Sequence, residues 1–210
     1  MPIRIVIADD HAIVREGLRM ILESQSDFQV AGEAVTGREA LLQAEALQPD
    51  VIIMDIAMPE LNGIEAVRMI SEQVPSTRTI MLSMHHTQEH VFRAVQAGAS
   101  GYILKESAGS HVVTAIRTVM KGLQYFCEGV EAPPKTRSVP RSPVDRLSPR
   151  ELEVIQLVAE GKTSVEIAEI LSLSPKSIET YRSRLMQKLG INNIPALVKF
   201  AILHGITPSE

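Results

Sequence analysis

Short apolar runs alternate with helical patterns through residues 1–122, and this alternation constrains the fold more than any other feature of the chain. Near-continuous apolar runs of this length are typical of strands buried on both faces of a sheet, and five strand–helix repeats predict a doubly wound α/β fold with a five-stranded parallel sheet. The predicted strands are residues 3–8, 28–34, 51–54, 79–83 and 101–104. The predicted helices, where apolar residues recur at helical spacing, are residues 12–23, 38–47, 63–72, 88–97 and 109–121.

The remainder of the chain has a different pattern. Residues 128–146 contain four prolines and almost no apolar periodicity, which is typical of a linker. Four helical patterns follow, and the first begins at Ser148 with a proline and an acid in its first turn. We therefore expect an all-α four-helix domain after the linker. The predicted boundaries are 1–122 for the first domain, 123–146 for the linker and 147–210 for the second domain.

The negative charge of the chain is unevenly distributed. The formal net charge is −4, of which residues 1–122 contribute −5 and residues 147–210 contribute zero. Within the second domain, basic residues gather in one predicted helix against a single acid, Glu179. This distribution indicates an acidic first domain and a local basic face on the second. The basic residues are Lys176, Arg182, Arg184 and Lys188.

Cysteine content and hydropathy bear on the compartment. The single cysteine, Cys127, excludes an intramolecular disulfide and a thiolate metal cluster, which fits a reducing cytosol. The first residues lack a signal-peptide pattern, and no apolar run approaches the roughly 18–20 residues that a membrane span needs. We expect a soluble, cytoplasmic protein.

Acidic residues follow two predicted strands that should be neighbours. Asp9 and Asp10 end the first strand and Asp55 ends the third, and taken singly such aspartates often cap helices. Three carboxylates brought together repel one another unless a cation joins them, and hard oxygen ligands favour Mg²⁺. Ser83 and Lys105 end two further strands and supply a hydroxyl and an ammonium group. Together these groups predict a site for phosphoryl transfer to an aspartate.

The first domain resembles the receiver domain of two-component response regulators. The resemblance implies that Asp55 is the phosphoacceptor, that Ser83 and Lys105 hold the phosphoryl oxygens, and that Tyr102 turns inward on activation. It also implies a Mg²⁺ site formed by Asp9, Asp10, Asp55 and the backbone carbonyl of Ala57, and a sensor histidine kinase as donor. The motifs that carry it are IVIADDH (5–11), DVIIMDIAMPELNGIE (50–65), TIMLSMH (79–85) and AVQAGASGYILK (94–105).

Residues 147–191 closely resemble the helix-turn-helix of the NarL/FixJ and LuxR-type regulators. Helix 164–171 is predicted to pack on helix 175–189 across a short turn, which leaves the outer face of the second helix for the major groove of DNA. The residues that carry the resemblance are Ser148, Glu151, Val154, Gly161, Ile167, Ala168, Leu171, Ser174, Ile178, Leu185, Lys188 and Leu189.

Contacts to DNA divide by expected role. By alignment with the family, Glu179, Thr180 and Ser183 face bases, and a glutamate is able to accept from cytosine N4. The residues expected at phosphates are Lys176, Tyr181, Arg184 and Lys188, and Arg182 lies on the same outward face. The alternative is that these charges only solvate an exposed helix.

The last predicted helix, residues 193–203, has more apolar surface than a small domain needs. Part of it is expected to form a dimer surface, as the resemblance also implies for the phosphorylated protein, or to close the domain core. Its apolar residues are Ile194, Leu197, Val198, Ala201 and Ile202.

The leading hypothesis is a phosphorylation-controlled transcription factor without catalytic turnover. A phosphohydrolase that uses an aspartyl-phosphate is disfavoured, because such enzymes have a second acid where this chain has Ala57. A flavin or nucleotide site is disfavoured by the acids that follow the first strand. A transition-metal site at His85, His86 and His90 is disfavoured against a solvated helix entrance.

Overall fold

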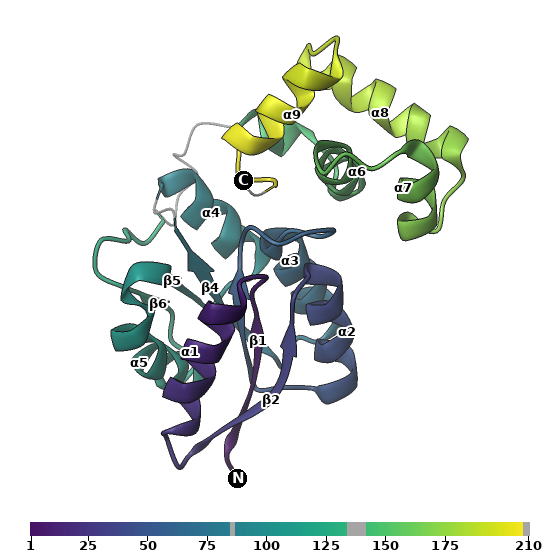
Figure 1. Ribbon diagram of the computed structural model, residues 1–210. Coiled ribbons are helices and arrows are strands. Elements are labelled where there is room, and N and C mark those ends of the chain that lie inside the picture. Colours follow the sequence, from purple (N-terminus) through teal and green to yellow (C-terminus); the bar gives the residue numbers. More distant parts are fainter. Residues whose placement is uncertain (85–86, 134–141, 208–210) are drawn as a thin grey trace. The chain divides into compact units, whose positions relative to one another are not determined.

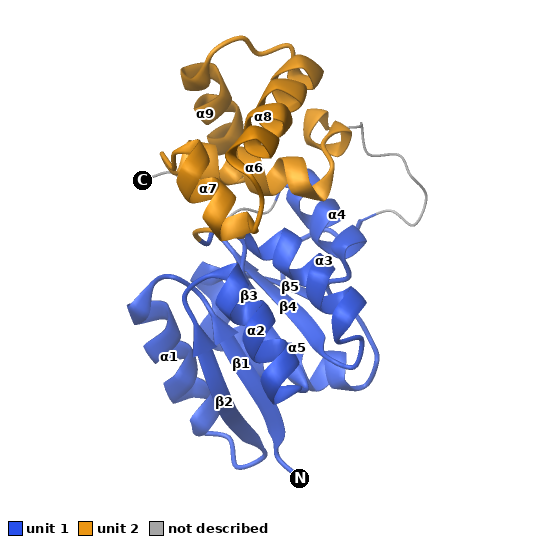
Figure 2. Cartoon of the chain, turned by 90° about the vertical axis from the view of Figure 1, so that its right-hand side faces the viewer, with its two compact units in different colours: residues 1–58, 62–139 blue, residues 59–61, 140–210 orange. Residues whose placement is uncertain are grey.

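The computed structural model describes residues 1–84, 87–133 and 142–207. The chain divides into two compact units, of which the first holds residues 1–58 and 62–139 and the second holds residues 59–61 and 140–210 (Figure 2). Within the described ranges, no helix is both long and apolar enough to cross a bilayer.

The first unit is a parallel sheet covered by helices on both faces (Figure 1). Helices α1 and α5 contact each other on one side, and α2, α3 and α4 pack in succession on the other. The strands are β1 (Ile3–Ala8), β2 (Phe28–Ala34), β3 (Val51–Asp55), β4 (Arg78–Ser83), β5 (Gly101–Leu104) and β6 (Tyr125–Phe126), in the order β2-β1-β3-β4-β5-β6. The helices are α1 (Ala12–Glu23), α2 (Gly37–Leu47), α3 (Gly63–Gln73), α4 (Gln88–Ala97) and α5 (Ala108–Met120), with a 3-10 turn η1 (Lys105–Ser107) after β5.

The sheet has six strands among the described residues, so the predicted count of five is wrong by one. The additional strand, β6, lies within the segment predicted to be linker. Tyr125 N donates to Ser100 O at 3.1 Å and Cys127 N donates to Tyr102 O at 3.1 Å, which pairs β6 with β5. A two-residue strand leaves no apolar run that a periodicity analysis can detect.

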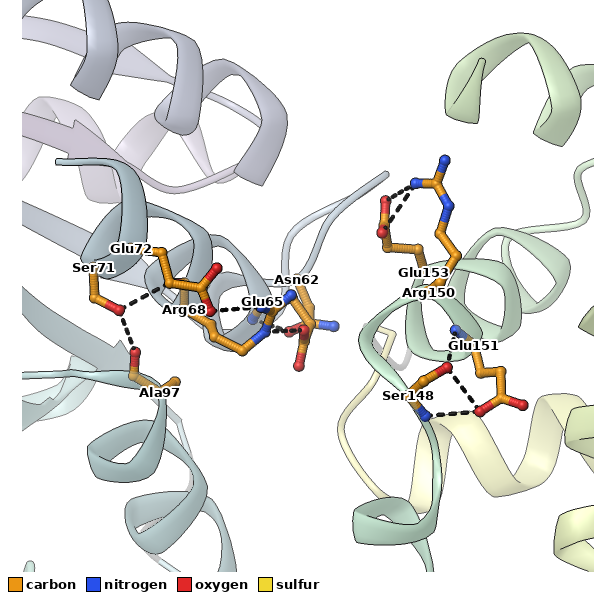
Figure 3. Close-up of polar contacts among 10 residues, drawn as sticks. All are labelled: Asn62, Glu65, Arg68, Ser71, Glu72, Ala97, Ser148, Arg150, Glu151 and Glu153. Carbon is orange, nitrogen blue, oxygen red and sulfur yellow. Dashed lines mark hydrogen bonds and ion pairs between the residues drawn. The ribbon is translucent and has the colours of Figure 1, made fainter. Parts of the chain in front are cut away.

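The first turn of α3 packs directly against the end of β3. Asn62 caps this helix, because its Oδ1 accepts from Glu65 N at 3.0 Å (Figure 3). A Cβ on Gly63 would lie 1.8 Å from the carbonyl oxygen of Asp55, and Gly63 N donates to Ile56 O at 2.9 Å. Only glycine allows the helix to begin this close to the strand end.

The second unit is helical. Its described residues form a 3-10 turn, η2 (Pro143–Arg146), and four helices: α6 (Pro149–Ala159), α7 (Ser164–Leu171), α8 (Pro175–Leu189) and α9 (Ile194–Leu203). Side chains cap the helices at the expected positions, and Ser148 and Thr163 each form a reciprocal capping box with an acid three residues later. The apolar residues predicted to join α7 to α8 lie in one buried core: Ile167, Ala168, Leu171, Ile178 and Leu185, with Leu189 partly buried against it.

Candidate functional site: an acidic cluster and an exposed helix

Asp9 is the most enclosed acid at the carboxyl ends of the strands. Its side chain is fully buried, and Oδ1 accepts from the backbone N of His11 at 2.9 Å. The His11 ring also approaches the acids, with Nδ1 2.7 Å from Asp10 Oδ1 and 3.1 Å from Asp9 Oδ1. The turn after β1 therefore directs both aspartates toward the end of β3.

Lys105 joins the two buried carboxylates. Its Nζ lies 2.8 Å from Asp9 Oδ2 and 2.8 Å from Asp55 Oδ2, and its side chain is 10% exposed. Burial acts to lower the pKa of Lys105. The contacts with Asp55 and Asp9 raise it by more than burial lowers it, so the pKa lies above its usual value. The ammonium group is thus held charged, as binding of phosphoryl oxygens requires.

The donor set at this rim fits a hard divalent cation. One ligand atom from each of Asp9, Asp10, His11 and Asp55 lies within 4.8 Å of the others. Three of the four are carboxylate oxygens, which Mg²⁺ prefers, and its remaining positions are commonly filled by water and phosphate. The predicted convergence of Asp9, Asp10 and Asp55 is present.

The surroundings of Asp55 disfavour its ionised form. Burial, and next the charge of Asp9, raise the pKa of Asp55 to about 6, and Lys105 offsets only part of this effect. A cation bound at the rim would favour the ionised carboxylate, which is the form that attacks phosphorus. A larger fraction of Asp55 would therefore be ionised when a cation neutralises the rim.

Ser83 and Tyr102 lie on adjacent strands, β4 and β5, and both are buried. Burial raises the pKa of Tyr102 to about 12, and a hydrogen bond with Ser83 opposes that rise. The phenol is thus in an inward position, coupled to the hydroxyl that the resemblance assigns to the phosphoryl group. Ala57 lies two residues beyond Asp55 and is partly buried, and its carbonyl remains a predicted ligand.

In the second unit, α8 carries the residues predicted to contact DNA, but one of them, Tyr181, packs against the domain core. Six of them are exposed and two are partly buried. Glu179 is already engaged, because its carboxylate accepts from Ser164 Oγ at the start of α7 and from Arg182 Nη2. The exposed residues are Lys176, Glu179, Thr180, Ser183, Arg184 and Lys188, and the partly buried ones are Tyr181 and Arg182.

Lys188 has a structural partner. Its Nζ lies 2.7 Å from Glu151 Oε2, and the same oxygen accepts from Ser148 N at 2.7 Å and Ser148 Oγ at 2.9 Å (Figure 3 shows Ser148 and Glu151). Burial acts to raise the pKa of Glu151. The contacts with Lys188 and Ser148 lower it by more than burial raises it, so the pKa lies below its usual value. Contact of Lys188 with a phosphate stays a prediction, and it would have to compete with this ion pair.

Helix α9 divides its apolar residues between two faces. Leu197 and Ala201 lie in the core, whereas Ile194 and Ile202 are exposed. The two alternatives drawn from the sequence therefore apply to different sides of the helix. The exposed side is the part that remains available for a dimer contact.

One residue near the acidic cluster, Arg15, does not belong to any of the motifs in the sequence. Arg15 donates from Nη1 to the carbonyl of Asp9 at 2.7 Å, and it lies on α1 at helical spacing from buried Leu18 and Leu22. An arginine on an apolar face is a signal that the sequence contained.

Of the histidine trio, His85 and His86 lie outside the described residues, and His90 Nδ1 is 2.8 Å from Thr87 Oγ1.

Comparison with family models agrees with this organisation. Residues 5–117 match the response regulator receiver domain, and residues 145–201 match the bacterial regulatory proteins of the luxR family. Among curated relatives, the transcriptional regulatory protein MctR of Rhizobium johnstonii is 38% identical over 97% of this chain and 95% of its own length. The response regulator UvrY of Escherichia coli is 37% identical over 99% of this chain and 97% of its own length. Each spans almost the whole protein.

Solved structures of RcsB are similar to the full length of the chain. The RcsB response regulator of Salmonella typhimurium is 30% identical, with a TM-score of 0.58, and the match covers 95% of this chain and 97% of RcsB. A structure of two RcsB dimers bound to two parallel DNAs gives a TM-score of 0.60 at 30% identity and covers 99% of this chain and 100% of that one.

Proposed function

The chain belongs to the two-component response regulators of the NarL/FixJ family, and we propose that phosphorylation of Asp55 controls its binding to promoter DNA. It is a DNA-binding transcription regulator with a receiver domain and a LuxR-type helix-turn-helix domain. The observation that carries the proposal is the convergence of Asp9, Asp10 and Asp55 with Lys105 at one end of a parallel sheet. A regulator that binds the chromosome acts in the cytoplasm.

The proposed step at the first unit is an acyl-phosphate synthesis. A carboxylate oxygen of Asp55 attacks the phosphorus of a phosphohistidine on a sensor kinase, and the P–N bond breaks as the P–O bond forms. Asp9, Asp10, Asp55 and the Ala57 carbonyl would hold Mg²⁺, which would supply positive charge to the reacting oxygens. Lys105 exchanges its contact with Asp55 for a phosphoryl oxygen.

Ser83 and Tyr102 transmit the change within the sheet. A phosphoryl group adds about −1.5 to −2 charges and new acceptor oxygens next to Ser83. We expect the Ser83 hydroxyl to donate to it, which alters the hydrogen bond that Ser83 shares with Tyr102. The side-chain arrangement at β4 and β5 is the two-state element of this proposal.

The first experiment labels the full chain with a radioactive acyl-phosphate donor and Mg²⁺. We expect at most one phosphoryl group per chain and complete loss of label in Asp55→Asn. Asp50→Asn is the matched control. Asp50 precedes β3, its Oδ2 accepts from Arg4 N at 2.7 Å, and it does not belong to the acidic cluster. Label retained in Asp55→Asn would refute the phosphoacceptor, and repeated release of phosphate would identify a phosphohydrolase.

The second experiment tests the DNA-binding half. We propose that α8 enters the major groove and that two copies pair when phosphorylated, with the exposed side of α9 as one candidate surface. Footprinting on genomic DNA with and without the donor should show protection of paired half-sites that increases with phosphorylation. Protection that is identical for wild type and Asp55→Asn with the donor would separate DNA binding from the phosphoryl switch.

A further inference from the structure

Arg15 connects the acidic turn to the edge of the sheet. It lies in α1, its side chain is 15% exposed, and its Nη1 donates to the backbone carbonyl of Asp9 at 2.7 Å. Its Nε lies 3.3 Å from Glu33 Oε2 on β2. One guanidinium group thus connects the edge strand β2 to the residue that follows β1.

The contact completes the fixation of Asp9. The backbone N of Asp9 donates to Ala34 O at 3.1 Å, Oδ1 accepts from His11 N at 2.9 Å, and Oδ2 lies 2.8 Å from Lys105 Nζ. The carbonyl is the remaining polar group, and Arg15 is its side-chain donor. Because Asp9 is fully buried, loss of this donor would leave the carbonyl to find another partner by moving the turn.

Glu33 anchors Arg15 from the opposite side. Its carboxylate is shared with Arg19, whose Nη2 lies 2.6 Å from Oε1, and its backbone carbonyl accepts from the Gln43 side chain. In the parallel pairing of β1 with β2, Glu33 is opposite Ile7, two residues before Asp9. The anchor is therefore part of the same sheet register that places the acids.

We propose that Arg15 is a positioning residue for the acidic cluster, which holds the Asp9–Asp10 turn so that its carboxylates converge on a divalent cation. The inference rests on the proposed function, because it concerns the same Mg²⁺ site. Arginine suits this role better than lysine, since its fixed fork donates in two directions at once. Groups that orient metal ligands typically change affinity about 10- to 100-fold when removed.

Arg19 provides a matched control. It lies one turn further along α1 and shares the same carboxylate, but its side-chain contacts are with Glu33 and Glu23, and it is 42% exposed. Arg15→Gln and Arg19→Gln each remove one positive charge from the same helix. By charge alone, removing either cation would strengthen Mg²⁺ binding, so a weakening that is confined to the Arg15 variant indicates positioning.

The test is calorimetric titration of the full-length chain with MgCl₂, without a phosphoryl donor, after circular dichroism has confirmed that each variant is folded. We expect Arg15→Gln to weaken Mg²⁺ affinity about 10-fold, Arg19→Gln to stay within about 2-fold of wild type, and Arg15→Lys to fall between wild type and Arg15→Gln. If Arg15→Gln does not fold, the Mg²⁺ affinity of Arg15→Lys alone tests the proposal.

The outcomes distinguish failure of the proposed function from failure of the positioning role of Arg15. If wild type binds no Mg²⁺ and takes no label, the proposed function fails. If wild type binds Mg²⁺ and the folded Arg15 variants bind it with the same affinity, the positioning role is overturned while the function stands. An equal loss in the Arg15 and Arg19 variants would also overturn it.

Discussion

The acidic cluster of the first unit and the outer face of α8 in the second unit both carry charge, but they are organised in opposite ways. At the cluster, Asp9 and Asp55 are buried and Lys105 is held between them at 2.8 Å from each. On α8, Glu179 and Arg182 pair with each other in a setting where both remain substantially exposed. Burial makes every partner at the cluster obligatory, whereas solvent on α8 leaves partners exchangeable.

The difference predicts a gradient in the free energy of unfolding. Substitutions at the cluster should change it by several kcal/mol, and substitutions on α8 should change it little while altering recognition of DNA. Four variants, taken from the largest expected effect to the smallest, test this contrast.

Gly63→Ala should produce the largest loss. The added Cβ would meet the carbonyl oxygen of Asp55 at 1.8 Å, and neither the strand nor the helix start is able to yield without moving Asp55. We expect a loss of about 3 kcal/mol or more in urea unfolding. Gly17→Ala is the control, because nothing lies within 4 Å of its Cβ, and it should gain about 0.5–1 kcal/mol. Equal effects at the two glycines would break the contrast.

Asp55→Asn should stabilise the metal-free protein at neutral pH. Below the ordinary pKa of 3.8, Asp55 is protonated in both states, but as pH rises through the folded pKa of about 6 the folded protein must ionise a buried carboxyl and loses stability. A shift of this size corresponds to about 3 kcal/mol, so the variant should exceed wild type by that order at pH 7 in EDTA.

The same difference should vanish near pH 4 and shrink when Mg²⁺ is added, because the cation restores wild type more than the variant. Thermal unfolding across this pH range, with and without Mg²⁺, measures both effects. A difference that persists unchanged at pH 4 would assign the stabilisation to something other than the charge on Asp55.

Glu151→Gln should have an intermediate effect, of about 1 kcal/mol, because it weakens the reciprocal cap of α6 by removing the carboxylate charge and removes the ion pair with Lys188. The pKa of Glu151 is lowered in the folded state, so its contribution is present above 4.5 and is lost as pH falls through the folded pKa. Lys188→Gln leaves the two bonds from Ser148 in place and should cost less. The reverse order would indicate that the ion pair outweighs the cap.

Glu179→Gln should change the free energy of unfolding least, by no more than about 0.5 kcal/mol. Since Glu179 accepts from Ser164 and Arg182, the variant should release Arg182 and alter base preference by about 10-fold on duplexes with single changes in one half-site. Lys176→Gln is the control and should weaken all duplexes alike, with a smaller salt dependence. An unchanged preference among the duplexes would instead make Glu179 part of the solvated face.

Much of the cluster could be predicted from the sequence, because a parallel sheet places the carboxyl ends of its strands at one rim. Asp9, Asp55 and Lys105 each end an apolar run, and the fold then brings them into contact. Arg15 was missed since its contact is with a backbone carbonyl, which leaves no paired motif. β6 was missed since its two residues are held by the neighbouring strand and not by a pattern of their own.

Less could be predicted on α8. The helical register placed Lys176, Thr180 and Ser183 on the outward face correctly, but side-chain pairing on an exposed helix is not determined by spacing. Ser164 reaches Glu179 from another helix, and Lys188 reaches back to α6. Both contacts depend on how α6 and α7 cross α8, which the sequence pattern does not specify.

The pairing of β6 with β5 bears on how the receiver is dissected. A fragment ending at residue 122 would strip the donors from Ser100 O and Tyr102 O and remove the Cys127 sulfur that accepts from Leu104 N at 3.4 Å. It would leave β5, which contains Tyr102, as an unpaired edge strand, and such edges promote edge-to-edge aggregation. A fragment that extends to Val130, which is buried, keeps β6 paired with β5. We therefore expect the two fragments to differ more in solubility than in phosphorylation.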